Sequence, residues 1–225
     1  MNVFLFDIDG TLIDAGGAGQ AAMEQSLAEE FGAVGPVSGI STAGRTDRAI
    51  AMDLFKFHGI EVTDDHWSRY LKSYFRLLPD SLQNRPGVIL PGVHELLQSL
   101  GNRDNLKLGL LTGNFAEGAR LKLDHYGLTQ YFSVGGFGDE HLDRDDVART
   151  AWQLVQGHHP RVELERVWVI GDTPSDIRCA RAIGAKVLAV ATGIFTAEDL
   201  GPHQPDMLLD DLSDATKWLQ MAGLE

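Results

Sequence analysis

Short apolar runs alternate with longer amphipathic segments along most of the chain. The first four of these runs are almost wholly apolar, a character typical of strands that are buried on both faces of a parallel sheet. The predicted strands are residues 3–6, 106–111, 167–170, 187–191 and 207–209. Helical periodicity marks residues 92–101, 115–126, 146–158, 174–184 and 213–221. The alternation predicts an α/β fold with a doubly wound parallel sheet.

One long stretch departs from this alternation. Residues 7–105 separate the first predicted strand from the second and contain no convincing strand of their own. Three segments within it, residues 17–31, 46–58 and 64–78, have helical periodicity instead. We interpret this block as an inserted α-helical cap that covers residues 16–85. The predicted catalytic core is then residues 1–15 together with residues 86–225.

Composition and charge narrow the function classes. The 225 residues include 32 Asp and Glu against 19 Lys and Arg, a formal net charge of −13, which argues against sequence-independent nucleic-acid binding. No apolar run approaches the roughly 20 residues of a membrane helix, and the N-terminus lacks the basic segment of a secretory signal. With the single cysteine Cys179, these features predict a cytoplasmic protein without a nucleic-acid or membrane partner. The sequence carries no signal for an oligomeric state.

Polar side chains with chemical potential follow three of the predicted strands. They are Asp7 and Asp9 after the first strand, Thr112 after the second, and Asp172 and Asp176 after the strand at 167–170. Open α/β sheets bind ligands beside the carboxyl ends of their strands, so we expect these side chains to share one site. Clustered carboxylates suit Mg²⁺. A carboxylate can attack phosphorus, a second carboxyl group can protonate the leaving oxygen, and the Thr112 hydroxyl and Gly113 amide can bind phosphoryl oxygens.

These motifs resemble those of a known family. Residues 7–11 (Asp-Ile-Asp-Gly-Thr), Thr112 at a strand end, and Gly171-Asp172 followed by Asp176 resemble motifs I, II and IV of the haloacid dehalogenase (HAD) superfamily. The helical insert resembles the C1 cap of that superfamily. Within the superfamily, the chain is most similar to phosphoglycolate-phosphatase-like hydrolases, because residues 44–47 (Gly-Arg-Thr-Asp) and the order of elements both match. The resemblance covers nearly the whole chain and implies a Rossmann-like core.

The resemblance also implies a role for each matching residue. Asp7 would be the nucleophile and a Mg²⁺ ligand, and Asp9 would be the general acid and base with its backbone carbonyl on the metal. Thr112 would bind the phosphoryl group. Asp172 would be a metal ligand, and Asp176 either a direct ligand or a residue behind one. Because the superfamily's dehalogenases lack an acid/base Asp at the position of Asp9, the resemblance favours phosphate chemistry over carbon–halogen hydrolysis.

The cationic residue of motif III departs from the family pattern. The superfamily usually has a Lys there, whereas residues 138–146 contain no Lys and Arg144 is their only cation. We expect Arg144 to stabilise phosphate and order the nucleophile, although an arginine fork binds with a different geometry. Lys122, on the helix after motif II, is the alternative if Arg144 points away. Arg45 is expected either to reach an anionic group at the far end of the substrate or to serve the cap or its surface.

Together these observations predict a Mg²⁺-dependent phosphomonoester hydrolase that works through an aspartyl-phosphate. Its partner would be a small phosphorylated metabolite, with phosphoglycolate, sugar phosphates, nucleoside monophosphates and pyrophosphate all open. One alternative is a phosphosugar mutase on the same core, and another is a non-catalytic phosphate-binding regulatory protein. A dinucleotide-dependent oxidoreductase is disfavoured, because the Gly-rich segment at residues 17–22 begins about ten residues after the strand it should follow directly.

Overall fold

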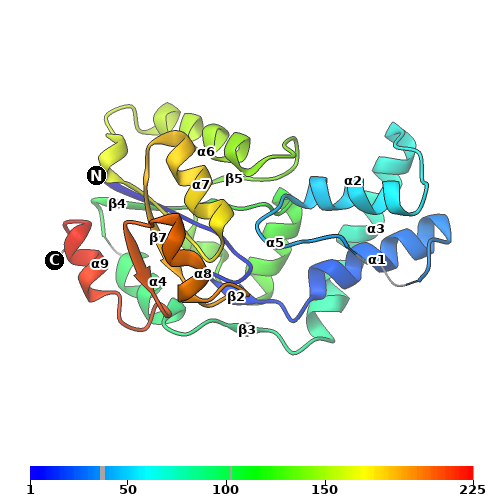
Figure 1. The fold of residues 1–225 in the computed structure, drawn as a ribbon, viewed down its shortest axis with the longest axis horizontal. Coiled ribbons are helices and arrows are strands. Elements are labelled where there is room, and N and C mark those ends of the chain that lie inside the picture. Colours follow the sequence, from blue (N-terminus) through cyan, green and yellow to red (C-terminus); the bar gives the residue numbers. More distant parts are fainter. Residues whose placement is uncertain (36–38, 102, 225) are drawn as a thin grey trace.

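A six-stranded sheet forms the centre of the core in the computed structural model, which describes residues 1–35, 39–101 and 103–224 (Figure 1). All neighbouring strands in it are parallel, in the order β5-β4-β1-β6-β7-β8. The strands are β1 (Asn2–Phe6), β4 (Leu106–Leu111), β5 (Val134–Gly136), β6 (Val167–Gly171), β7 (Lys186–Val190) and β8 (Met207–Leu209). The predicted doubly wound α/β fold is therefore confirmed.

Helices cover both faces of this sheet. One face packs against α4 (Val93–Gly101), α5 (Ala116–His125) and α9 (Thr216–Met221), and the other against α6 (Arg144–His158) and α7 (Pro174–Ile183). Shorter helices are α8 (Ala197–Leu200), η1 (Thr129–Tyr131), η2 (Leu164–Arg166) and η3 (Gly201–His203). In the described part of the chain, none of the helices is long and apolar enough to cross a membrane.

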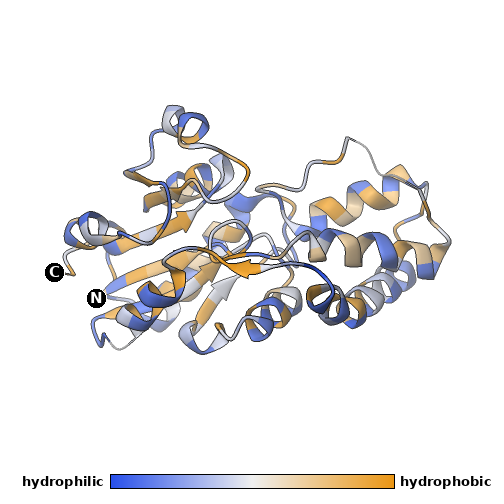
Figure 2. Cartoon of the chain, turned by 90° about the horizontal axis from the view of Figure 1, so that it is seen from below, coloured by the Kyte–Doolittle hydropathy of each residue, from blue (hydrophilic) through white to orange (hydrophobic). Residues whose placement is uncertain are grey.

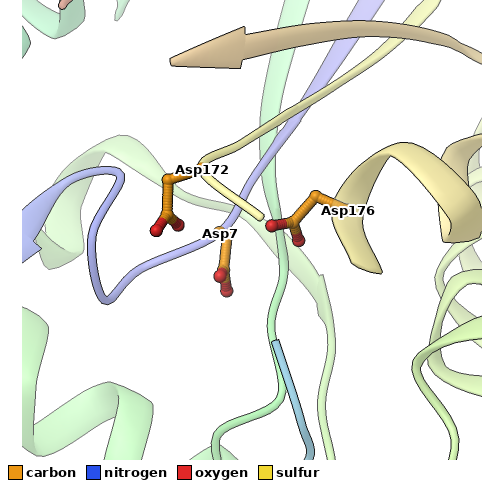
Figure 3. Close-up of side chains that lie close together, drawn as sticks. All are labelled: Asp7, Asp172 and Asp176. Atoms are coloured by element: carbon orange, nitrogen blue, oxygen red, sulfur yellow. The ribbon is translucent and has the colours of Figure 1, made fainter. Parts of the chain in front are cut away.

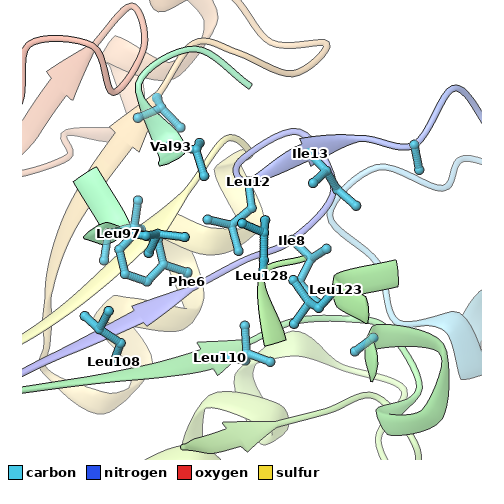
Figure 4. Packing of buried hydrophobic residues seen from close by; sticks show 14 of the residues in the cluster. Phe6, Ile8, Leu12, Ile13, Val93, Leu97, Leu108, Leu110, Leu123 and Leu128 are labelled. Atoms are coloured by element: carbon cyan, nitrogen blue, oxygen red, sulfur yellow. The ribbon is translucent and has the colours of Figure 1, made fainter. Parts of the chain in front are cut away.

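The alternation of side chains along β1 divides the core into two hydrophobic clusters. Phe4 and Phe6 belong to the cluster under α4, α5 and α9, whereas Val3 and Leu5 belong to the cluster under α6 and α7. Figure 4 shows part of the first cluster around Phe6. In Figure 2 the strands are largely hydrophobic while the helices carry both characters, as expected for a sheet buried on both faces. This burial makes β1 a rigid support for the polar residues that follow it.

Three helices lie beyond one end of the sheet, on the right of Figure 1. They are α1 (Ala18–Phe31), α2 (Asp47–Phe57) and α3 (Asp64–Gln83), and α3 packs against both α1 and the core helix α5. The chain enters this layer through β2 (Ile13–Asp14) and leaves it through β3 (Val88–Ile89), and these two strands pair antiparallel. Because entry and exit lie side by side, we propose residues 16–85 as the cap and the remainder as the core.

Some elements differ from the sequence-based expectation. β5 was not predicted, because its three residues include two glycines and carry no strand periodicity. The third cap helix was expected to end before Pro79 but continues to Gln83, since Leu77, Leu78 and Leu82 are buried on the same helix. Burial of that apolar face outweighs the backbone hydrogen bond that a proline cannot make.

Candidate active site

Three buried carboxylates meet beyond the carboxyl ends of β1 and β6 (Figure 3). Asp7 follows β1, Asp172 follows β6, and Asp176 lies in the first turn of α7. One oxygen of each side chain lies within 4.8 Å of an oxygen of the other two. Their exposed fractions are 5%, 3% and 0%, so water screens their mutual repulsion poorly.

Two glycines make room for the Asp172 carboxylate. A Cβ atom on Gly193 would lie 1.8 Å from Asp172 Oδ2, and one on Gly10 would lie 2.3 Å from the same oxygen. Gly10 also has a φ of 82°, a conformation that other residues rarely adopt. The Thr11 hydroxyl donates to Asp172 Oδ1 at 3.1 Å. The turn after β1 is therefore shaped around the carboxylate that follows β6.

Asp176 differs from the other two carboxylates because both of its oxygens are already bonded within the protein. Oδ2 accepts from the backbone N–H of Thr173 at 3.0 Å and from its hydroxyl at 2.7 Å, which completes the capping box of α7. Oδ1 accepts from Arg144 Nη2 at 2.5 Å. Of the two roles expected for Asp176, this arrangement favours the residue behind the ligands over the direct metal ligand.

Arg144 is the first residue of α6, and its side chain is only 3% exposed. Its guanidinium lies 3.4 Å from Asp7 Oδ1 and donates to the Leu111 carbonyl at 3.1 Å, in addition to its bond with Asp176. Burial alone would lower the pKa of Arg144, but Asp7 and Asp176 raise it above its usual value. The structure thus places a permanent positive charge between two of the three carboxylates.

One arginine does not offset the charge of the cluster. Burial raises the pKa of Asp7 to about 7, with a smaller contribution from the repulsion of Asp176 and Asp9, and overcomes the opposing effects of Arg144 and the Thr112 hydroxyl. Burial and the two neighbouring carboxylates raise the pKa of Asp172 well above its usual range. Buried carboxylates that repel one another and have oxygens to spare are the donor set that a hard divalent cation such as Mg²⁺ requires. The residues present therefore fit a metal site.

A second cation serves the other aspartate of the first motif. Asp9 has a side chain 43% exposed, and its Oδ2 accepts from Lys122 Nζ at 2.6 Å and from Asn114 Nδ2 at 2.8 Å. Lys122 is buried and also donates to Asn114 Oδ1 at 2.6 Å. Burial alone would lower the pKa of Lys122, but Asp9 and Asp47 raise it. Lys122 is therefore not placed where the motif III cation was expected, because its partner is Asp9 and not Asp7.

Asn114 is a site residue that the sequence-based reasoning missed. Its amide nitrogen donates to Thr112 Oγ1 at 2.8 Å as well as to Asp9, so it connects the end of β4 with the turn after β1. Thr112 is fully buried and is anchored by its backbone N–H to Gly136 O at 3.1 Å. The available signal was position, since Asn114 follows a buried strand by only three residues.

Gly113, expected to bind phosphoryl oxygens through its amide, also forms a contact between core and cap. Its carbonyl accepts from the backbone N–H of Asp47, at the start of α2, at 2.7 Å. A Cβ on Gly113 would lie 2.0 Å from the Arg45 carbonyl, so only glycine allows this approach. The Asp47 carboxylate in turn accepts from the Phe115 N–H at 2.9 Å, at the N-terminus of α5. The cap is thus docked directly on the loop that follows β4.

A cavity of about 420 Å³ lies between the docked cap and the carboxylates. Core residues with Asp7, Asp9, Asp172, Lys122 and Arg144 line one side, and cap residues from the start of α1 and the loop before α2 line the other. Arg45 lines this cavity, but its guanidinium pairs with Asp53 at 2.7 Å and donates to the Ser41 carbonyl at 3.1 Å. Both partners belong to the cap, so the cap-internal role expected for Arg45 is the one its contacts favour.

Replacing Asp47 with Asn is expected to change how stability depends on pH. Burial raises the pKa of Asp47 to about 6, against the opposing effect of Lys122 and the Phe115 N–H. Because this folded-state value exceeds the unfolded one of 3.8, the stability that Asp47 contributes is complete below about pH 4 and is lost as pH rises through about 6. Asn retains the acceptor for Phe115 without the charge. The free energy of unfolding of the variant relative to that of wild type should rise by roughly 1–2 kcal/mol from about pH 5 to about pH 8.

Urea denaturation of both proteins at the two pH values, with excess Mg²⁺ present, measures this difference. The magnesium keeps the titration of the three-carboxylate cluster the same in both proteins. A stability gap that stays constant between the two pH values would show that Asp47 is not titrating in this range.

The chain is similar to several known proteins. The family model for haloacid dehalogenase-like hydrolases matches residues 4–190. Phosphoglycolate phosphatase of Synechococcus elongatus is 30% identical over 217 residues, which cover 95% of each protein. A solved structure described as a predicted phosphoglycolate phosphatase from Haemophilus somnus superposes with a TM-score of 0.74, at 19% identity and 98% coverage of each chain. CbbY from Rhodobacter sphaeroides in complex with phosphate has a TM-score of 0.73, at 17% identity and 96% coverage of each chain. At these identities the two solved structures show a shared fold.

Proposed function

The chain belongs to the haloacid dehalogenase-like hydrolases and is a phosphatase, and from this premise we propose that it hydrolyses small phosphomonoesters through an aspartyl-phosphate on Asp7. The observation that carries the proposal is the difference in surroundings between the two aspartates of the turn after β1. Asp7 is buried in a carboxylate cluster beside Arg144, and Asp9 is partly exposed in the cavity. A buried nucleophile and an accessible acid are the two groups that such a reaction needs.

We propose that Mg²⁺ is held by Asp7, Asp172 and the backbone carbonyl of Asp9. Asp176 stays behind these ligands, because its oxygens are engaged by Thr173 and Arg144. When bound, the metal supplies positive charge that offsets the carboxylates and polarises a phosphoryl oxygen. The protein contributes the fixed positions of the ligands, which come from the ends of two strands of one rigid sheet.

In the proposed reaction, a carboxylate oxygen of Asp7 attacks phosphorus in line as the bond to the ester oxygen breaks. Asp9 gives its proton to the departing oxygen, which leaves as an alcohol. Asp9 then takes a proton from a water molecule, whose oxygen attacks the aspartyl-phosphate and releases phosphate and free Asp7. Arg144 and the Thr112 hydroxyl would bind the phosphoryl oxygens during both steps.

The substrate is proposed to be a small phosphorylated metabolite, enclosed between the core and the cap (residues 16–85). The cavity of about 420 Å³ suits a ligand of this size. Phosphoglycolate is the first candidate, because the 30% identical relative carries the name phosphoglycolate phosphatase. Cap closure over the ligand would exclude bulk water from the aspartyl-phosphate.

The test is phosphate release from a panel containing p-nitrophenyl phosphate, phosphoglycolate, sugar phosphates, a nucleoside monophosphate and pyrophosphate. We expect turnover of at least one monoester, ranked by kcat/KM, with phosphate as product. Interconversion of sugar-phosphate isomers without phosphate release would instead indicate a mutase. Binding of phosphate and Mg²⁺ with no turnover of any compound would overturn the proposal in favour of a regulatory protein.

A further inference from the structure

We propose that Lys122 and Asn114 are positioning residues that hold Asp9 by its Oδ2 atom, so that Oδ1 is the atom that delivers the proton to the departing oxygen. This inference rests on the acid role of Asp9 in the proposed function. It gives the buried lysine of α5 a task separate from that of Arg144.

The carrying observation is the unequal surroundings of the two Asp9 oxygens. Oδ2 accepts two hydrogen bonds, at 2.6 Å from Lys122 Nζ and at 2.8 Å from Asn114 Nδ2. Oδ1 receives no hydrogen bond from any residue that the structure describes. A transferable proton on a carboxyl group occupies the oxygen that is not already saturated by donors. The geometry therefore assigns that proton to Oδ1.

Lys122 and Asn114 are themselves fixed. The lysine is 4% exposed and the asparagine 5% exposed, and the two side chains bond to each other at 2.6 Å. Asn114 is also anchored to Thr112 at the end of β4. On the cap side, Gly19 lies so near that a Cβ atom there would be 3.4 Å from Lys122 Nζ. Lys122 and Asn114 are therefore anchored to the central sheet and covered by the start of α1.

Asp9 needs donors that fix the orientation of its carboxyl group more than Asp7 does. The side chain of Asp7 is 7% exposed and is held in the carboxylate cluster, whereas the side chain of Asp9 is 43% exposed in the cavity. An exposed carboxyl group rotates freely unless donors hold it, and misdirection of a general acid reduces proton transfer by roughly 10- to 100-fold. The resulting loss of rate depends on how strongly the departure of the leaving oxygen requires a proton.

Leaving groups of different acidity separate this role from a structural one. p-Nitrophenolate departs with little help from an acid, whereas an alkoxide departs only when it is protonated. The parameter kcat/KM reports the steps up to the loss of the alcohol or phenol. Lys122→Met should therefore lower kcat/KM for an alkyl phosphate by roughly 100-fold and for p-nitrophenyl phosphate by less than about 5-fold.

Three further variants complete the experiment. Lys122→Arg should recover part of the alkyl phosphate activity, because it restores a cationic donor. Asn114→Ala removes the other donor to Oδ2, should shift the ratio of the two substrates in the same direction, and replaces Lys122→Met if that variant does not fold. Lys72→Met removes an exposed helical lysine and should leave both substrates unchanged.

An equal fall for the alkyl and aryl esters in both Lys122→Met and Asn114→Ala would overturn the positioning role, because a structural effect does not depend on the leaving group. In that event wild-type turnover of both esters would still support the proposed function. Absence of wild-type turnover of every phosphomonoester in the panel, both of these esters included, would instead refute the proposed function itself.

Discussion

Asp7→Asn is expected to reduce kcat for phosphoester hydrolysis by roughly four orders of magnitude or more. The amide oxygen of Asn is a far weaker nucleophile than a carboxylate, and the change alters neither the size of the side chain nor its place beside Arg144. One of three mutually repelling carboxylates disappears, so the variant should also unfold at a temperature no lower than that of wild type without metal. Activity should therefore be lost without loss of the fold.

Two measurements make this prediction specific to Asp7. Acid quenching of wild type during turnover, followed by peptide mass analysis, should find phosphate on the peptide that contains Asp7, and Asp7→Asn should show none. Asp65→Asn, at a side chain 77% exposed on α3, is the matched control and should keep full activity. Activity that survives in Asp7→Asn would refute the covalent mechanism.

The residues at the strand ends could be predicted because their positions follow directly from the sheet. A wholly apolar strand must be buried, so the residue after it emerges at the carboxyl edge. Asp7, Thr112 and Asp172 were placed in this way, and the structure brings them to one edge. Once a parallel sheet is assumed, the place of each residue directly after its strand puts it at this edge, and the neighbouring positions of β4, β1 and β6 bring the three residues together.

The partners of the buried Lys122 could not be predicted, because they depend on how helices rotate and dock. Lys122 stands eight residues beyond Asn114, and nothing local to α5 indicates that the two side chains meet. The same applies to Asp47, whose carboxylate bonds to Phe115 across an interval of 68 residues. The Lys122–Asn114 contact arises only when α5 packs on the sheet, and the Asp47–Phe115 contact only when the cap docks on the core.

The separate pairing of the two cations has a mechanistic consequence. Arg144 lies with Asp7 and Asp176, and Lys122 lies with Asp9. Arginine cannot release its proton in a protein and forms several directed hydrogen bonds, which suits a residue that stays charged beside the proposed nucleophile and the phosphoryl group it would bind. Lysine is a compact donor with three N–H groups, so Lys122 can donate to Asp9 Oδ2 and to Asn114 Oδ1 at the same time. Each cation therefore matches the geometry of the aspartate that it contacts.

Removal of divalent metal is expected to abolish turnover, and addition of Mg²⁺ is expected to restore it. The reason is the charge of the site, where three buried carboxylates face one arginine and a dianionic phosphate must bind beside them. Chelation by EDTA followed by titration with Mg²⁺ measures the effect as phosphate release. Asp172→Asn should raise the Mg²⁺ concentration needed for half-maximal activity, whereas Asp65→Asn should leave it unchanged. Full activity in excess EDTA would refute the metal dependence.

The same metal should change how stability depends on pH, with a sign that the pKa values determine. Burial raises the pKa of Asp7 to about 7 from 3.8. Without metal, the stability that Asp7 contributes to the fold is therefore complete below about pH 4 and is lost as pH rises through about 7. Asp172 shifts in the same direction. Mg²⁺ binds the charged carboxylates, and a concentration of 100 Kd stabilises the fold by about 2.7 kcal/mol. The rise in Tm caused by Mg²⁺ should therefore be larger at about pH 8 than at about pH 5.5, and an equal rise at both values would contradict binding at this cluster.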